Sequence, residues 1–437
     1  MEKNRINYKP GVKFHNMAKK PVRQWRVLTW LIYVLSKIVM HKKYKLEKIN
    51  MEGVKAPYVI LSNHAAFADL EINGIATYPN RCHNIASLEG HHKRAWIMEP
   101  AGCIGKRKYT ADPYLLKACQ TILNDYKAIL TIYPEERYTP IGTTARLPQS
   151  YGSFLKYLKQ DVVILLHRGN HLRAPFWGWR NKRRVVTHST MKKVIDKSEL
   201  DNLTAEQVME IITRELQYDE YKYQKDNNIL ITEKKRAEGL HEVLYQCPHC
   251  KTEHEMSTKG HVLRCDACGK EWELTETGEL KAREGETEFP HIPDWFEWER
   301  ENVNREIAEG KYHYEDEVEL YGYPNTKRFI PLGKARVTHT YEKGFTVEGT
   351  YNGQDFVISR PSIGLYALHV EYDYPYIVHG VPLFQLSTSN DTFVCIPKKK
   401  EIVTKLSFAT EELYRLAKEA KDEKRRQREA EREKQPQ

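Results

Sequence analysis

The sequence contains no apolar run long enough to cross a bilayer. The run at residues 27–40 is interrupted by Thr29, Ser36 and Lys37, whereas a spanning helix needs roughly 18 or more apolar residues. No small-residue cleavage site follows it, which argues against a secretory signal. A hydrophobic content of 40% and a charged content of 29% are typical of a folded soluble or peripheral protein and exclude a multi-span or disordered chain.

Acidic residues are nearly missing from the first 45 residues. This segment carries 12 lysines and arginines against Glu2 alone. The net charge of +10 is therefore concentrated there, and such an arm attracts anionic lipid or nucleic acid. Because Trp25 and Trp30 accompany an apolar run between basic flanks, we expect an interfacial helix on a membrane surface with anionic lipid. The alternative is a core helix packed on the next domain.

Cysteine is scarce, and its spacing does not suggest a disulfide framework. Cys247 with Cys250 and Cys265 with Cys268 form two C-x-x-C pairs separated by fourteen residues. Two such pairs suit tetrahedral thiolate coordination of Zn²⁺, in a cage that iron also fits. The spacing predicts a zinc ribbon with a structural Zn²⁺ ion, in a protein of a reducing compartment.

The predicted ribbon is not basic. Residues 245–275 contain four lysines and arginines against five acidic residues, whereas a phosphate-binding surface should be basic. We therefore expect no nucleic acid partner, and we expect the ribbon to join its neighbouring domains or to dock a protein. A nucleic-acid-associated zinc-ribbon protein remains an alternative hypothesis, motivated by the basic arm and the four cysteines.

Between residues 45 and 240, strand and helix patterns alternate, which is typical of an α/β domain. The predicted strands lie at residues 58–62, 128–133 and 161–166. The predicted helices lie at residues 115–126, 154–158 and 201–225.

From about residue 334 the hydrophobic pattern has a period of two. Strands are predicted at residues 335–341, 345–350, 356–360, 365–372, 376–379, 384–388 and 392–396, followed by a helix at 409–421. Asn352-Gly353 is a strong hairpin signal. Seven strands followed by a helix resemble the pleckstrin-homology-like superfold, so we expect an all-β domain of this type that ends in a helix.

A polar turn directly after the first buried strand carries the candidate catalytic pair. It contains Asn63, His64 and, five positions after the histidine, Asp69. Strand ends of α/β sheets are common ligand sites. The Asp69 carboxylate can hold one imidazole nitrogen while the other takes a proton, and no enzyme nucleophile is needed when the substrate brings a hydroxyl. The structural alternatives are a hydrogen-bonded turn histidine and a helix-capping aspartate.

Three motifs in this order resemble the glycerolipid acyltransferase family, of the lysophosphatidic acid acyltransferase type. Asn63-His64 through Asp69 is similar to the family's N-H-x-x-x-x-D motif. Gly102-Cys-Ile-Gly-Lys-Arg107 is similar to the second block, which ends in a phosphate-binding arginine. Ile132-Tyr-Pro-Glu135 is similar to the third block, Phe-Pro-Glu-Gly-Thr-Arg. The resemblance covers roughly residues 50–200.

The resemblance implies a role for each of these residues. His64 would be the general base on an acceptor hydroxyl, and Asp69 would orient it. The acceptor's phosphate and hydroxyl would be bound by Asn63, Lys106, Arg107, Glu135 and Arg137. The acceptor would be a lysophospholipid such as 1-acylglycerol-3-phosphate, and the acyl donor would be acyl-CoA or acyl carrier protein. Such an enzyme of phospholipid biosynthesis would be cytoplasmic and peripheral on the inner face of the membrane.

The sequence departs from the family pattern in the third block and in the last strand. Glu136 replaces the glycine of the third block, Arg137-Tyr138 replaces Thr-Arg, and the strand at 161–166 lacks a proline. Without glycine a positive φ is less accessible, and a carboxylate would oppose a phosphate unless Arg137 compensates. A non-catalytic lipid-binding or scaffold protein on the same fold is therefore a second hypothesis. A surface ion pair is the structural alternative for Glu135 and Arg137.

Together these patterns predict six parts. They are a basic arm with an interfacial helix (1–44), an α/β acyltransferase domain (45–240), a zinc ribbon (241–275), a Trp-rich connector (276–330), a β domain with a C-terminal helix (331–421) and a charged tail (422–437).

Overall fold

The computed structural model describes residues 6–399 and 401–433. Contacts divide the chain into a larger unit, Asn16–Lys106 with Asp112–Phe296, and a smaller unit, Met1–His15 with Arg107–Ala111 and Glu297–Gln437. Residues 1–5 of the predicted basic arm and 434–437 of the predicted tail lie outside the described residues.

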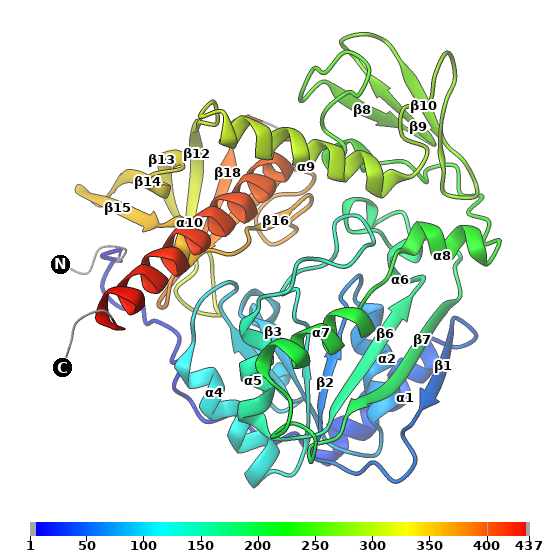
Figure 1. The fold of residues 1–437 in the computed structure, drawn as a ribbon, viewed down its shortest axis with the longest axis vertical. Coiled ribbons are helices and arrows are strands. Elements are labelled where there is room, and N and C mark those ends of the chain that lie inside the picture. Colours follow the sequence, from blue (N-terminus) through cyan, green and yellow to red (C-terminus); the bar gives the residue numbers. More distant parts are fainter. Residues whose placement is uncertain (1–5, 400, 434–437) are drawn as a thin grey trace. The chain divides into compact units, whose positions relative to one another are not determined.

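A seven-stranded sheet forms the centre of the larger unit, with the order β1-β7-β6-β2-β5-β3-β4 (Figure 1). The central strands are parallel, and β7 runs antiparallel to β6. The strands are β1 (Tyr44–Ile49), β2 (Val59–Ser62), β3 (Cys82–Ser87), β4 (Cys103–Lys106), β5 (Ile129–Ile132), β6 (Val162–Arg168) and β7 (Thr187–Ile195). The predicted α/β class is confirmed for this unit.

Eight helices are described in the larger unit. They are α1 (Arg26–Val39), α2 (Ala68–Thr77), α3 (Ala95–Met98), α4 (Pro113–Gln120), α5 (Ser150–Leu158), α6 (Asn170–Arg173), α7 (Ala205–Glu215) and α8 (Glu220–Asp226). The helix predicted at 201–225 is two helices, because Tyr218 enters the core between them and Asp219 caps α8 by accepting a hydrogen bond from Lys222 N. Among the described residues, no helix combines the length and the apolarity needed to cross a bilayer.

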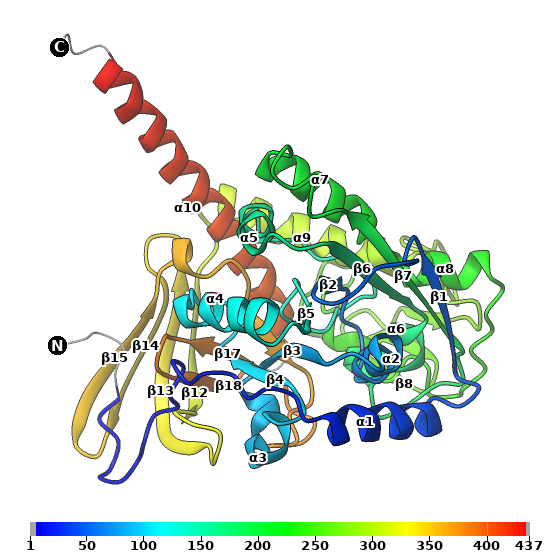
Figure 2. The ribbon, with the colours of Figure 1, turned by 90° about the horizontal axis from the view of Figure 1, so that it is seen from below.

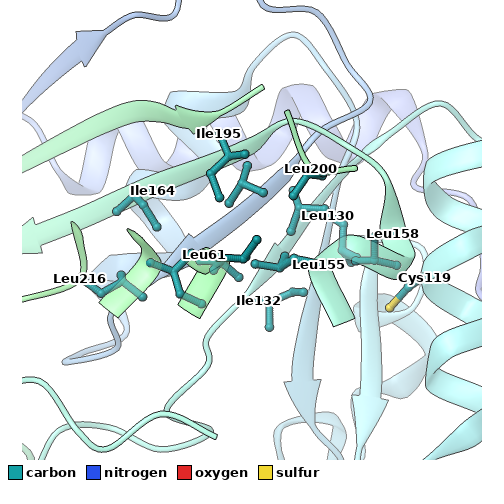
Figure 3. Packing of buried hydrophobic residues seen from close by; sticks show 14 of the residues in the cluster. Leu61, Cys119, Leu130, Ile132, Leu155, Leu158, Ile164, Ile195, Leu200 and Leu216 are labelled. Carbon is teal, nitrogen blue, oxygen red and sulfur yellow. The ribbon is translucent and has the colours of Figure 1, made fainter. Parts of the chain in front are cut away.

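Both faces of the central strands are buried, which explains why they are continuous apolar runs rather than alternating ones. On β2, Val59 and Leu61 belong to one core cluster, whereas Ile60 belongs to another. The first cluster packs strand residues against Leu155 of α5 and residues of α7 (Figure 3). On the other face α1 packs against α2 (Figure 2). These two layers hold the carboxyl ends of β2, β5 and β6 at one edge.

The cysteine-containing segment of the larger unit is a four-stranded antiparallel sheet with the order β11-β10-β9-β8. Its strands are β8 (Met256–Lys259), β9 (Val262–Cys265), β10 (Glu271–Leu274) and β11 (Leu280–Ala282). Several hydrogen bonds join it to the preceding α/β region, including His291 Nε2 with an oxygen of Asp219 at 2.8 Å and Gln224 Nε2 to Glu276 O at 3.0 Å.

The smaller unit is an antiparallel sheet with the order β15-β14-β13-β12-β18-β17-β16, so the predicted all-β class is confirmed. Its strands are β12 (Tyr314–Gly322), β13 (Ile330–Thr340), β14 (Gly344–Tyr351), β15 (Gln354–Arg360), β16 (His369–Glu371), β17 (Leu383–Ser387) and β18 (Thr392–Pro397). Helix α9 (Ile292–Ala308) passes through the boundary between the units, and α10 (Ile402–Glu433) follows the sheet. The pleckstrin-homology-like type remains a prediction.

Several details of the β domain differ from the prediction. The strand predicted at 365–372 is shorter, and the helix predicted at 409–421 is longer and continues into the predicted charged tail. Residues 376–379 form no strand, because Pro375 and Gly380 bound a turn closed by a bridge between Tyr374 and Val378. Conversely, β12 lies inside the predicted connector. Acidic and apolar residues alternate along β12, and Val318 and Leu320 are buried. The high content of glutamate made this segment look like a polar connector in the sequence.

Candidate active site

The turn after β2 is fixed by polar side chains that bond to β6. Ser62 Oγ donates a hydrogen bond to Leu165 O at 2.7 Å. Asn63 donates to His167 O at 2.9 Å and accepts from His167 N at 2.8 Å. Both ends of the Asn63 amide thus bond to the backbone of β6 and position the next residue at the carboxyl edge of the sheet.

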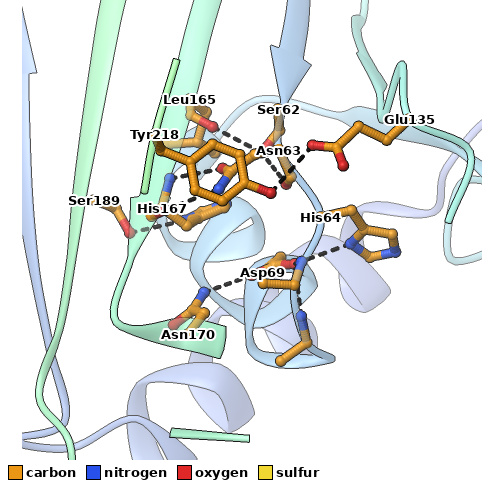
Figure 4. Close-up of polar contacts among 12 residues, drawn as sticks. Ser62, Asn63, His64, Asp69, Glu135, Leu165, His167, Asn170, Ser189 and Tyr218 are labelled. Carbon is orange, nitrogen blue, oxygen red and sulfur yellow. Dashed lines mark hydrogen bonds and ion pairs between the residues drawn. The ribbon is translucent and has the colours of Figure 1, made fainter. Parts of the chain in front are cut away.

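His64 and Asp69 form a hydrogen-bonded pair at this edge (Figure 4). His64 Nδ1 lies 2.9 Å from Asp69 Oδ2, which also accepts from Ala65 N at 2.7 Å and Ala66 N at 3.0 Å. Asn170 Nδ2 donates to the other carboxylate oxygen. Asp69 lies inside α2 without capping it, so the helix-capping interpretation is wrong.

The environment of Asp69 keeps it ionised. Complete burial opposes its charge, but the hydrogen bond from His64 and the neighbouring His167 outweigh this and hold the pKa of the Asp69 carboxyl below its usual range. An ionised carboxylate at Nδ1 favours the imidazole tautomer with its proton on that nitrogen. His64 Nε2 is then the basic nitrogen.

Two tyrosines hold the imidazole ring of His64. Its centroid lies 4.1 Å from that of Tyr133 and 4.2 Å from that of Tyr138, and its side chain is 22% exposed. Within residues 6–399 and 401–433, His64 Nε2 has no hydrogen-bond partner. This nitrogen is therefore available to a substrate hydroxyl.

Glu135 and Arg137 are almost fully buried, so the surface-ion-pair interpretation is wrong. Burial raises the pKa of the Glu135 carboxyl to about 8, although Arg137 and a hydrogen bond from Tyr218 lower it. Tyr218 Oη lies 3.3 Å from Glu135 Oε1. In Figure 4 Glu135 lies near the turn that carries Asn63 and His64. The fold therefore brings the first and third motifs together.

Lys106 pairs with the residue that departs from the family pattern. Its ammonium forms an ion pair with the Glu136 carboxylate, and both side chains are mostly buried. Glu136 has a φ of +53°, a left-handed conformation that glycine adopts more easily, so the turn carries strain at this residue. Lys106 therefore supplies a positive charge directly against the Glu136 carboxylate.

Arg107 belongs to the smaller unit and not to the unit of His64. Its buried guanidinium donates to the carbonyls of Tyr323, Pro324 and Asn390 and to Thr392 Oγ1 at 2.9–3.1 Å. These partners lie next to β12 and β18. The Arg107 guanidinium is thus hydrogen-bonded within the β domain, and its role on an acceptor phosphate stays a prediction.

We expect Arg107→Ala to destabilise the β domain by about 3 kcal/mol or more, since several hydrogen bonds to a buried charge are lost. Hydrogen–deuterium exchange of the full chain should show faster exchange in β12 and β18, with Arg168→Ala as the control. Unchanged exchange together with weaker binding of a phosphate-bearing acceptor would support the role implied by the family instead.

An apolar cavity of about 260 Å³ lies in the larger unit. Its walls come from α1 and α2, with residues of β3 and of the segment 98–103. Phe67, three residues after His64, is 65% exposed and lines it. Gly74 lets the two helices approach, because a Cβ there would lie 2.8 Å from Ile32 Cγ2. The volume is slightly below the roughly 300–1,000 Å³ of drug-sized ligand sites, so the cavity has room for a single aliphatic chain.

Four cysteines of the ribbon form a cluster suited to a metal ion. The Sγ atoms of Cys247, Cys250, Cys265 and Cys268 all lie within 4.8 Å of one another. Positive φ angles at Lys251 and Gly269, each directly after a cysteine pair, turn the backbone around the sulfurs. Four thiolates in this arrangement fit a tetrahedral, closed site.

Several site residues were missed by sequence reasoning. Asn170 lies 101 positions from Asp69, and Tyr218 lies 83 positions from Glu135. Only the position of Asn170, two residues after the end of buried strand β6, could have marked it. Tyr133 and Tyr138 lie within or beside the third motif but gave no signal of contact with His64.

Comparisons with known proteins found few similarities. No protein-family model matches this chain, and no curated protein matches it. A solved structure, the 1-acyl-sn-glycerophosphate (LPA) acyltransferase PlsC from Thermotoga maritima, is similar over 43% of this chain and 78% of its own, with 13% identity and a TM-score of 0.34. Similarity of this extent assigns neither an activity nor a substrate.

Proposed function

We propose that this protein transfers a fatty acyl group from an acyl thioester to the hydroxyl of a lysophospholipid such as 1-acylglycerol-3-phosphate. The observation that carries the proposal is the buried, ionised Asp69 at His64 Nδ1, which leaves Nε2 open. The same turn supplies Phe67 to the lining of an apolar cavity. An oriented imidazole with a free nitrogen is suited to general-base catalysis.

In the proposed reaction His64 Nε2 takes the proton of the acceptor hydroxyl as its oxygen attacks the thioester carbonyl carbon. The C–O bond forms, the C–S bond breaks, and the thiolate leaves with the proton that His64 returns. Asp69 stabilises the imidazolium between these steps. The apolar cavity would hold an aliphatic chain during the transfer.

The proposal is tested by thiol release from acyl-CoA or acyl carrier protein in the presence of a panel of lysophospholipids. We expect release that depends on the acceptor. No release with any donor and acceptor would favour the second candidate, a non-catalytic lipid-binding protein, for which the Lys106–Glu136 pair is the supporting observation: it neutralises a cation that an acceptor phosphate would need.

We further propose that α1 lies on a membrane surface, because its burial pattern is inverted. Its buried residues are Thr29 and Ser36, whereas Trp30, Leu31 and Ile38 are 38–66% exposed. Basic residues flank the helix on both sides. An apolar exposed face with tryptophans and basic flanks is suited to a bilayer interface with anionic lipid.

We expect the double variant Trp30→Gln, Ile38→Gln to bind anionic vesicles at least about tenfold less tightly, since each buried apolar side chain contributes roughly 1.5–3 kcal/mol. Sedimentation with vesicles measures this. The matched control is Tyr114→Gln, Leu116→Gln on α4, which changes side chains of similar exposure. Equal pelleting of both variants would contradict the assignment of α1.

We propose that the four-cysteine cluster holds a structural Zn²⁺ ion. The supporting observation is the cluster of four converging sulfurs. Four thiolates fill the tetrahedral coordination of the ion and leave no position for water.

A further inference from the structure

Two polar side chains that line the apolar cavity have hydrogen-bonding groups with no partner among the described residues. Ser36 on α1 and Asn84 on β3 line it and are 6% and 8% exposed. Within the described part of the chain, neither Ser36 Oγ nor Asn84 Nδ2 makes a hydrogen bond. By contrast, Thr29, also on α1 and lining the cavity, donates its hydroxyl proton to neighbouring oxygens of Gln24 and Trp25.

Ser36 and Asn84 border the same turn of α2. Asn84 Oδ1 accepts a hydrogen bond from Asn73 Nδ2 at 2.7 Å, so its amide is oriented with the NH₂ group unused. Gly74 follows Asn73 on α2, and Ser36 Oγ lies 3.8 Å from the position that a Cβ atom on Gly74 would occupy. The lining of the cavity therefore includes an unused amide donor and an unused hydroxyl, each beside the same turn of α2.

Burial of unpaired polar groups is unfavourable, and a ligand that supplies the missing partner gains affinity over one that does not. A hydroxyl matches both groups, because it accepts a hydrogen bond from the Asn84 amide and can donate to or accept from Ser36 Oγ. An unsubstituted aliphatic chain would leave both unpaired.

We propose that the cavity binds an aliphatic chain carrying a hydroxyl group, and that Ser36 and Asn84 recognise this hydroxyl. In the proposed acyl transfer, on which this inference rests, the aliphatic chain is the acyl group of the donor. The substrate class is therefore hydroxylated fatty acyl thioesters. Leu35 and Val39, both 45% or more exposed, line the same cavity from α1, so its entrance is apolar.

Direct binding separates this proposal from catalysis. Isothermal titration of the full chain with dodecanoic acid and with its positional hydroxy isomers measures the preference without any turnover. For one or two neighbouring hydroxyl positions we expect binding about tenfold tighter than for dodecanoic acid, the effect of one or two net hydrogen bonds. Equal affinity for all isomers and the unsubstituted acid would overturn the proposal.

Two variants and a matched control identify the groups responsible. Ser36→Ala should reduce the preference about threefold, and Asn84→Leu should abolish it while binding of dodecanoic acid is kept or improved. Asn80→Leu makes the same change at an exposed residue of the cavity lining and should retain the preference. A preference that survives both Ser36→Ala and Asn84→Leu would also overturn the proposal. Alanine is compatible with helix α1, so Ser36→Ala should fold and give a clear result.

Thioester turnover distinguishes failure of the two proposals. A hydroxyl preference in binding without thiol release would retain the ligand class and overturn acyl transfer. Acceptor-dependent thiol release with equal rates for hydroxylated and unsubstituted dodecanoyl-CoA, and equal affinities in titration, would retain acyl transfer and overturn the recognition of a hydroxyl.

Discussion

Replacement of His64 by alanine is expected to reduce the rate of acyl transfer about 10²–10⁴-fold, the usual contribution of a positioned general base. His64 Nε2 is the basic nitrogen that the turn after β2 leaves open, and Asp69 Oδ2 holds Nδ1 at 2.9 Å. Without the imidazole the acceptor hydroxyl must lose its proton to water. The effect should appear in the maximal rate more than in the concentration of lipid needed for half-saturation.

The matched control is His188→Ala, which removes a histidine on β7 of the same sheet and should keep full activity. Asp69→Asn preserves the size of the side chain but removes the charge that stabilises the imidazolium, so it should also lose activity, with vesicle binding unchanged. A fully active His64→Ala enzyme would show that the pair has only a structural role in the turn.

The paired substitution Cys247→Ser, Cys265→Ser is expected to abolish metal binding and unfold the four-stranded ribbon. Structural zinc contributes about 10–16 kcal/mol of apparent binding free energy in small thiolate sites, which far exceeds what a sheet of this size gains from its own core. Elemental analysis should give one zinc per wild-type chain and none for the variant. Hydrogen exchange should rise from β8 to β11.

The control for this experiment is Cys119→Ala with Cys395→Ala, which changes two buried cysteines outside the cluster and should retain one metal. A wild-type protein that contains no metal and is nevertheless protected in β8 to β11 would contradict the zinc assignment. Iron in place of zinc would retain the site and correct only its ion.

Local motifs were readable from the sequence because their residues lie close together along the chain in a recognisable context. His64 and Asp69 lie within one turn and the start of its helix, directly after a buried strand, and there the imidazole reaches the carboxylate. The same spacing at His261 and Asp266 forms no such pair, since His261 lies against Glu273 and Asp266 accepts from Ser257. The two cysteine pairs likewise converge through two short turns and a hairpin. The buried strands were readable because continuous apolar runs are typical of parallel strands covered on both faces.

Residues that depend on long-range folding were not readable. Arg107 follows Lys106 in one motif, yet the chain carries residues 107–111 into the smaller unit, where carbonyls next to β12 and β18 surround the guanidinium. The apolar content of α1 was evident, but which face it buries depends on its packing against α2. The partner of Asp69 across 101 positions, Asn170, follows only from the pairing of β2 with β6.

The most direct test of the central claim is the identity of the product. Wild-type protein is incubated with isotope-labelled acyl-CoA and vesicles containing 1-acylglycerol-3-phosphate, and lipid and thiol are both quantified by mass spectrometry. The account predicts labelled diacylated lipid in amounts equal to the free thiol, with neither formed by His64→Ala. Thiol released without labelled lipid, or labelled lipid formed equally by His64→Ala, would contradict it.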